Sequence, residues 1–304
     1  MNPGGDYTPG LDFFERLEEP AAGSLSRSVR IGPFSIRLDG IPAALEPTIS
    51  DHYLGFISKP LPDHNLRLEL RRAEVDQFLD LQIDPRRYYV QRADGKRLLI
   101  HGHYFGGWFE RDGSSALLAV CKEGWPGLRV PLELFLRAYC AWRAIGRDGF
   151  LLHAASLLRD GRVYVFFGHS GAGKTTVSQL SAGDCLILSD DMTLITQEKE
   201  GFMAHSVPFR GPVRERQVTE RHTYPIAGLY QLVQAPGVRL EPLDRPRAAA
   251  AVLSCMPFVT DPMIPADPAQ TLAIVERAAR QIPVFRLEFT RSNEFWKPVL
   301  AKVR

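Results

Sequence analysis

Hydrophobic and polar residues alternate along much of the first half of the chain, as they do in strands that bury one face. The alternation occurs in SVRIGPFSIRL, in NLRLELRR and throughout RYYVQRADGKRLLIHGHYFGGWFERDGSSALLAVC, which two Asp-Gly turn signals divide. Helices are expected within IPAALEPTISDHYLGFI and PLELFLRAYCAWRAIG, the second of which is strongly amphipathic. We therefore predict a β-rich domain over residues 28–146, preceded by a flexible lead-in over residues 1–27.

After residue 146 the pattern changes to alternating strands and helices. The stretch GFLLHAASLLRDGRVYVFFG indicates two strands joined at Asp160-Gly161, and the helical stretch TTVSQLSAG follows soon after. Further strands are expected in CLILSDDMTLIT, FMAHSVPF, GLYQLVQ and VFRLEF, and helices near 247–256, 268–281 and 293–303. We predict an α/β domain over residues 147–304.

A glycine-rich turn separates the second of these strands from its helix. Its sequence, GHSGAGKT over residues 168–175, fills every fixed position of G-x-x-x-x-G-K-[ST]. The three glycines let the backbone approach a phosphate closely, and its N–H groups and the helix start attract anionic oxygens. With the strand before it and the helix after it, the turn predicts a nucleoside triphosphate site.

The residues of this turn have expected roles. Lys174 would reach the β- and γ-phosphates, and the Thr175 hydroxyl would coordinate Mg²⁺. ATP and Mg²⁺ are therefore the expected cofactors, although the sequence does not distinguish ATP from another phosphate donor. The residues expected to hold the phosphates are Gly168, His169, Ser170, Gly171, Ala172, Gly173, Lys174, Thr175 and Thr176.

Two acidic residues, Asp190 and Asp191, end an apolar strand 16 and 17 residues after Lys174. In phosphate-loop proteins a carboxylate at such a strand end acts through Mg²⁺. A second carboxylate beside it can accept a proton from a substrate hydroxyl, whereas an efficient ATPase would have Asp-Glu there. Adjacent aspartates also serve as turn residues, so both interpretations stay open here.

A histidine, His153, stands 15 residues before Gly168 on the first strand of the hairpin. The turn at Asp160-Gly161 would bring it near the strand end that leads to the nucleotide. There it could hold an aspartate or stabilise the transferring phosphoryl group. A histidine on an apolar strand is more often a core residue, so the residues alone leave its role open.

The segments LHAASL, FFGHSGAGKTT and LSDDMTLI resemble the C-terminal catalytic domain of HPr kinase/phosphorylase and, more distantly, the nucleotide site of phosphoenolpyruvate carboxykinase. The sequence is most similar to HPr-kinase-like proteins found with peptide-modification systems. The resemblance implies an α/β P-loop kinase of the HPr kinase/phosphoenolpyruvate carboxykinase type with a β-rich N-terminal region. It also implies that His153 matches a family histidine, that Asp190 is the base toward a serine hydroxyl, and that Asp191 helps to hold Mg²⁺.

The chain departs from the HPr kinases after the strand FMAHSVPF. Their signature has a Glu before an Arg-Gly pair, where this chain has PFRGPVRE with Glu215 only loosely positioned, and their later glycine-arginine element is absent. The resemblance therefore implies neither phosphorolysis nor HPr as the substrate. The basic residues of this loop could steady a γ-phosphate or form a solvated surface offset by acidic neighbours. They are Arg210, Arg214, Arg216 and Arg221.

Two weaker signals lie in the β-rich domain. His101 and His103 share one strand face and could ligate a metal, but no Cys or carboxylate nearby completes a set. The aromatic residues Tyr104, Trp108 and Phe109 are typical of a sheet core, and could also belong to a groove for an extended peptide.

Composition and charge narrow the partners. A net charge of +2 over 304 residues gives no reason to expect nucleic acid. The four cysteines are widely spaced, as in a protein with reduced thiols, and the N-terminus lacks the regions of a signal peptide. No apolar run approaches the roughly 20 residues that span a bilayer, so we expect a cytoplasmic protein with no membrane partner. HPr kinase relatives form oligomers, and the resemblance therefore allows a homo-oligomer.

Together these features predict an ATP- and Mg²⁺-dependent kinase that phosphorylates a Ser or Thr hydroxyl of a peptide or small protein. Its catalytic residues would be Asp190, His153 and Lys174. The alternatives are a kinase acting on a small-molecule hydroxyl and a nucleotide-binding switch protein that is not a kinase. Only analogy assigns substrate recruitment to the N-terminal domain.

Overall fold

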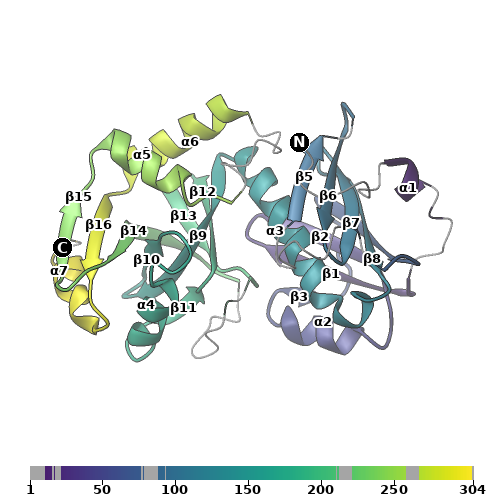
Figure 1. Ribbon diagram of the computed structural model, residues 1–304, viewed down its shortest axis with the longest axis horizontal. Helices are drawn as coiled ribbons and strands as arrows, with labels where there is room; N and C mark the ends of the chain where they lie inside the picture. Colours follow the sequence, from purple (N-terminus) through teal and green to yellow (C-terminus); the bar gives the residue numbers. More distant parts are fainter. Residues whose placement is uncertain are drawn as a thin grey trace. The chain divides into compact units, whose positions relative to one another are not determined.

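The protein belongs to the predicted α/β class and contains two large β-sheets (Figure 1). Its computed structural model divides into two compact units between Cys140 and Ala141, close to the predicted boundary at residue 146. The structure describes residues 11–15, 17, 22–76, 78, 88–92, 94–209, 211, 221–257 and 267–302. None of the helices in these ranges is both long enough and apolar enough to cross a membrane.

The N-terminal unit is built on one eight-stranded sheet of order β3-β1-β2-β4-β8-β7-β6-β5, in which β2, β4 and β8 run parallel. Its strands are β1 (Leu25–Ile31), β2 (Phe34–Ile41), β3 (Ile57–Ser58), β4 (Leu66–Ala73), β5 (Tyr88–Arg92), β6 (Arg97–Gly102), β7 (Phe105–Glu110) and β8 (Ser115–Cys121). Its helices are α1 (Leu11–Glu15), α2 (Glu46–His52), a 3-10 turn (Trp125–Gly127) and α3 (Arg129–Ile145), whose last residues pass into the second unit.

Two features of this unit bear on the expectations from sequence. Phe109 is fully buried against Phe135 and Tyr139 of α3, so the sheet-core interpretation holds for this aromatic residue. The prediction of a flexible lead-in was wrong over Leu11–Glu15, because α1 forms there and buries Phe14 in a stacked contact with Phe78. This helix is so short that its apolar residues change the average composition of the lead-in very little.

The C-terminal unit carries the second sheet. Its strands are β9 (Gly149–Arg159), β10 (Arg162–Phe167), β11 (Leu186–Ser189), β12 (Met192–Glu198), β13 (Gly201–His205), β14 (Thr223–Gln234), β15 (Arg239–Pro242) and β16 (Val284–Phe289). Its helices are α4 (Lys174–Ser181), α5 (Arg245–Leu253), α6 (Pro268–Gln281), a 3-10 turn (Asn293–Phe295) and α7 (Trp296–Ala301). Asp160 and Gly161 both have left-handed φ angles, 51° and 75°, so the hairpin predicted between β9 and β10 forms with an Asp-Gly turn.

Two long strands of this sheet each pair with three others along their length. β9 pairs with β12 through residues 149–153 and with β11 through residues 156–158, while its residues 154–159 pair with β10 on the other edge. β14 pairs antiparallel with β13 at its start and parallel with β10 further on. The pairing from β10 through β9, β12, β13 and β14 therefore returns to β10, and the glycine-rich turn follows Phe167, which pairs with Ala154 of β9.

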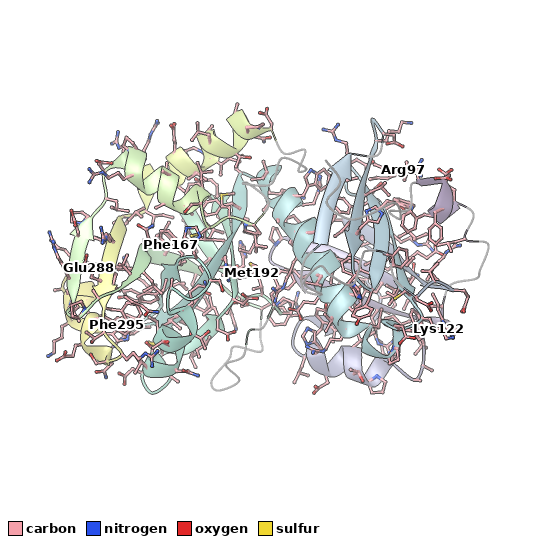
Figure 2. The ribbon with its side chains drawn as sticks, viewed as in Figure 1. Arg97, Lys122, Phe167, Met192, Glu288 and Phe295 are labelled. Atoms are coloured by element: carbon pink, nitrogen blue, oxygen red, sulfur yellow. The ribbon has the colours of Figure 1, made fainter. Side chains whose placement is uncertain are left out.

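Helices cover both faces of β10 (Figure 1). Val163, Val165 and Phe167 pack in a cluster with residues of α5 and α6, while Tyr164 and Phe166 pack with residues of α4 and α7. A strand buried on both faces has an unbroken apolar sequence, which explains the run VYVFF before the turn. Figure 2 shows the side chains of these layers, with Phe167 and Phe295 labelled.

The packing around Phe166 predicts a large loss of stability on truncation. Its ring is fully buried against Tyr230, Phe295 and Trp296. Phe166→Ala is expected to lower the free energy of unfolding by about 3–5 kcal/mol, measured by urea denaturation. The exposed Leu272 provides the control, because Leu272→Ala should stay within about 0.5 kcal/mol of the wild type. Equal losses in the two variants would contradict the packing argument.

Candidate functional site

The glycine-rich turn joins β10 to α4, as the sequence predicted. β10 ends at Phe167, and α4 begins at Lys174 with a hydrogen bond from the Val177 N–H to the Gly173 carbonyl. Gly171 and Gly173 have φ angles of 81° and 107°, in the left-handed region that favours glycine. The backbone N–H groups at the start of α4 and in the turn make a suitable site for anionic oxygens.

Lys174 folds back over this turn. Its ammonium donates to the carbonyl oxygens of Gly168 and His169, at 2.8 and 3.1 Å. The side chain is buried, and burial lowers its pKa, while the charge of Asp191 acts in the opposite direction. A positive charge is therefore held inside the turn, where it can neutralise a phosphate.

Two residues from distant strands support the turn. Gln234, at the end of β14, donates its side-chain amide to the Gly171 carbonyl at 2.7 Å. Phe289, at the end of β16, lies so close to Gly173 that a Cβ there would come within 2.6 Å of its ring. Neither residue was predicted from the sequence, because no local motif marks a side chain that reaches the turn from another strand.

The two aspartates form the connection between β11 and β12. Ser189, the last residue of β11, donates its hydroxyl to the Phe209 carbonyl at 3.0 Å. The same hydroxyl accepts the N–H groups of Asp191 and Met192, at 3.3 and 3.1 Å. Ser189 is buried, so this hydroxyl fixes the backbone that carries the aspartates.

The two carboxylates have different surroundings. Asp190 is only 2% exposed and accepts the Gly211 N–H at 2.7 Å. Asp191 is partly exposed, and its Oδ1 lies 3.3 Å from Nε2 of His153. The charge of Asp191 also raises the pKa of Lys174, against the effect of burial. Asp191 thus has a histidine partner and an influence on the lysine.

His153 lies on β9, one residue before the pairing of this strand with β10 begins. It pairs with Met192 of β12, while its neighbour Ala154 pairs with Phe167, the last residue before the turn. The Ala154 N–H also donates to the Asp191 carbonyl at 3.0 Å. The hairpin therefore brings His153 beside the turn and an aspartate, as the sequence predicted.

The predicted contributions of Arg210, Arg214, Glu215 and Arg216 lie outside the described residues, while Arg221 is described and exposed. His101 and His103 are buried in the N-terminal unit. Across the described ranges, no group of three or more His, Cys, Asp or Glu side chains could hold a metal ion. An Mg²⁺ ion bound mainly by phosphate and water needs no such group, because it takes only one or two protein ligands.

The fold and site define a mixed α/β protein with a glycine-rich turn, a buried lysine and a histidine–aspartate pair in one unit. Residues 136–303 match the family described as SynChlorMet cassette protein ScmC. This match covers more than half of the chain and includes every residue of the cluster, so the chain belongs to the ScmC family. None of the curated proteins matches the chain.

The Ser189 hydroxyl is expected to be necessary for the order of the aspartate connection. Ser189→Ala removes the acceptor of two N–H groups and should cost about 1–3 kcal/mol in the free energy of unfolding. Hydrogen exchange at Asp191 and Met192 should become faster. The control is Ser58→Ala, since Ser58 is exposed and its hydroxyl bonds only to a local carbonyl. Unchanged exchange at both amides would contradict this role.

Proposed function

We propose that the protein is a P-loop kinase of the HPr kinase/phosphoenolpyruvate carboxykinase type. It would use Mg²⁺-ATP to phosphorylate a Ser or Thr hydroxyl of a peptide or small protein. One observation carries the proposal: a complete phosphate-loop motif lies between a strand and a helix, with Asp191 and His153 paired close to its lysine. The peptide acceptor is supported by the sequence resemblance alone.

The glycine-rich turn would hold the triphosphate. Its N–H groups and the start of α4 would contact the phosphate oxygens, while Lys174 would leave the turn carbonyls for the β- and γ-phosphates. Thr175 would contribute its hydroxyl to Mg²⁺. Because phosphoryl transfer depends mainly on positioning and charge stabilisation, the rigid support of the turn by Gln234 and Phe289 favours this chemistry.

The transfer step replaces one oxygen on the γ-phosphorus by another. The acceptor hydroxyl oxygen forms a bond to the γ-phosphorus, the bond from that phosphorus to the β–γ bridging oxygen breaks, and ADP leaves with the electron pair. The hydroxyl proton passes to a carboxylate. His153 would hold that carboxylate in place or stabilise the transferring group.

The two aspartates admit two assignments. The resemblance implies that Asp190 accepts the proton and that Asp191 holds Mg²⁺ with Thr175. Exposure favours the exchanged roles, because Asp190 is buried and bonded to Gly211 whereas Asp191 is accessible beside His153. The two assignments predict opposite behaviour of the asparagine variants.

Labelled γ-phosphate transfer from Mg²⁺-ATP to an extract of small peptides and metabolites tests the proposal. Label is expected on a Ser- or Thr-bearing peptide. The variant lacking the base should lose about 100-fold or more in kcat at every Mg²⁺ concentration. The variant lacking the metal ligand should instead recover activity as Mg²⁺ is raised. Asp190→Asn and Asp191→Asn are compared with Asp184→Asn, since Asp184 is exposed beyond the end of α4.

Two results would overturn this function. If ATP binds but label stays in nucleotide or appears only as free phosphate, the protein is a nucleotide switch. If label appears on a free metabolite instead of a peptide, the kinase acts on a small molecule.

Nucleotide affinity should depend on the ionisation of Lys174. Burial lowers its pKa below the ordinary value of 10.5, and a bound triphosphate would raise the pKa again by favouring the charged form. At a pH where Lys174 of the free protein is deprotonated, binding of the triphosphate therefore requires that Lys174 takes up a proton. Affinity should be full below the lowered pKa and should fall as pH rises from there toward 10.5.

Isothermal titration calorimetry of ATP across this pH range measures the effect. Lys174→Arg is the matched variant, because arginine keeps its charge throughout and should remove the decline in affinity. A decline of the same size in both proteins would assign the pH dependence to another group.

A further inference from the structure

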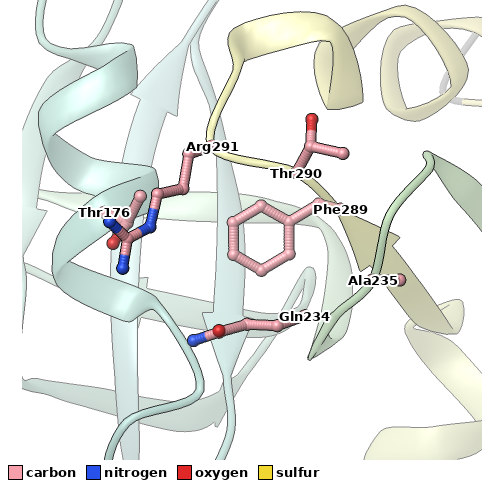
Figure 3. Close-up of a pocket in the computed structure, with 6 residues that line it drawn as sticks. All are labelled: Thr176, Gln234, Ala235, Phe289, Thr290 and Arg291. Atoms are coloured by element: carbon pink, nitrogen blue, oxygen red, sulfur yellow. The ribbon is translucent and has the colours of Figure 1, made fainter.

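A cavity of about 100 Å³ opens beside the glycine-rich turn (Figure 3). It lies among the start of α4, the end of β14 and the segment that follows β16. The described residues that line it are Thr176, Gln234, Ala235, Phe289, Thr290 and Arg291. Neither the motif nor the histidine–aspartate pair accounts for this cavity.

The cavity adjoins the turn through three of its lining residues. Thr176 directly follows the last residue of the motif, Gln234 donates to the Gly171 carbonyl, and Phe289 packs against Gly173. The residues that support the turn thus also form walls of the cavity. A ligand whose phosphates occupy the turn would have its remaining part at or near this cavity.

The walls of the cavity offer flat and apolar surfaces for the part of the ligand that lies beyond its phosphates. In Figure 3, the side chain of Arg291 lies to the left of the Phe289 ring and the side chain of Gln234 lies below it. Arg291 is exposed and forms no ion pair with another residue of the described ranges, so its planar guanidinium is available for stacking. The methyl groups of Ala235 and the threonines add apolar surface.

Few groups are free to recognise the edge of a base. The Gln234 amide donates to the turn, and the Thr290 hydroxyl shares a hydrogen bond with Ser292 at 3.0 Å. None of the six lining residues has a carboxylate, which could accept the N–H groups of a guanine edge. The walls therefore suit stacking, which tolerates different bases because every base has a π-face.

We propose that this cavity is the nucleoside subsite of the kinase, in which a purine base stacks on Arg291 with little selection between adenine and guanine. The inference rests on the proposed function, because the phosphates of the same nucleotide must occupy the turn. It adds a residue, Arg291, that would hold the nucleoside and not the phosphates. It also predicts that GTP can replace ATP.

Calorimetry with the Mg²⁺ complexes of ATP, GTP and tripolyphosphate tests the subsite. In the wild type, ATP and GTP should bind within about threefold of each other, and both should bind about tenfold or more tightly than tripolyphosphate. Arg291→Ala should weaken both nucleotides about tenfold and leave tripolyphosphate unchanged. Arg286→Ala, on the exposed side of β16, is the control and should change none of the three.

Arg291→Lys separates stacking from charge. Lysine keeps the charge but lacks the planar group, so it should bind nucleotides as weakly as the alanine variant. Full affinity in Arg291→Lys, or equal weakening of nucleotides and tripolyphosphate in Arg291→Ala, would show that Arg291 contacts phosphate and would overturn the subsite. Unchanged nucleotide binding in Arg291→Ala, or a preference above about tenfold for one purine, would also overturn it.

The outcomes distinguish this inference from the proposed function. If the wild type binds tripolyphosphate and nucleotides equally, the phosphate turn stands and the nucleoside subsite fails. If none of the three ligands binds, both proposals fail together.

Discussion

The pairing of β9 along both of its edges is the constraint on which the site depends. His153 is the last residue of β9 that pairs with β12, and Ala154 begins the pairing with β10 on the other edge. Phe167, the partner of Ala154, is the last residue of β10 before the glycine-rich turn. The same point fixes the backbone of Asp191, whose carbonyl accepts the Ala154 N–H. One strand therefore sets the spacing between a phosphate-binding loop and the residues that would act beside it.

The turn also depends on close packing at its other side. Phe289 occupies the space that a side chain at Gly173 would need, and Gln234 holds the carbonyl of Gly171. Both supporting residues end strands of the parallel group β10, β14 and β16, so the sheet register determines where they meet the turn. A shift in that register would move the supports and the cavity wall together. The conformation of the turn is thus a property of the whole sheet and not of the motif alone.

The pairing of β9 and the packing on the turn explain which parts of the site could be predicted from the sequence. The position of His153 followed from a two-residue turn, because an Asp-Gly hairpin fixes the register of its flanking strands. The strand, turn and helix around Gly173 followed from the motif. Phe289 and Gln234 could not be predicted, since parallel pairing is set by packing between distant segments and leaves no local signal. The different exposure of Asp190 and Asp191 was hidden for the same reason, because it depends on Gly211 in a later segment.

The closed pairing of β10, β9, β12, β13 and β14 has a consequence for how the protein folds. β9 and β10 can form early, because a short hairpin joins them, but β10 gains its second neighbour only when β14 arrives from much later in the chain. Contacts between such distant segments carry a cost in loop-closure entropy and slow folding. During synthesis, one edge of β10 must therefore stay without β14 until that strand has left the ribosome. An unpaired strand edge favours aggregation, so we expect the C-terminal unit to be most prone to aggregation in that interval, and the turn gains the support of Phe289 only when β16 joins the sheet.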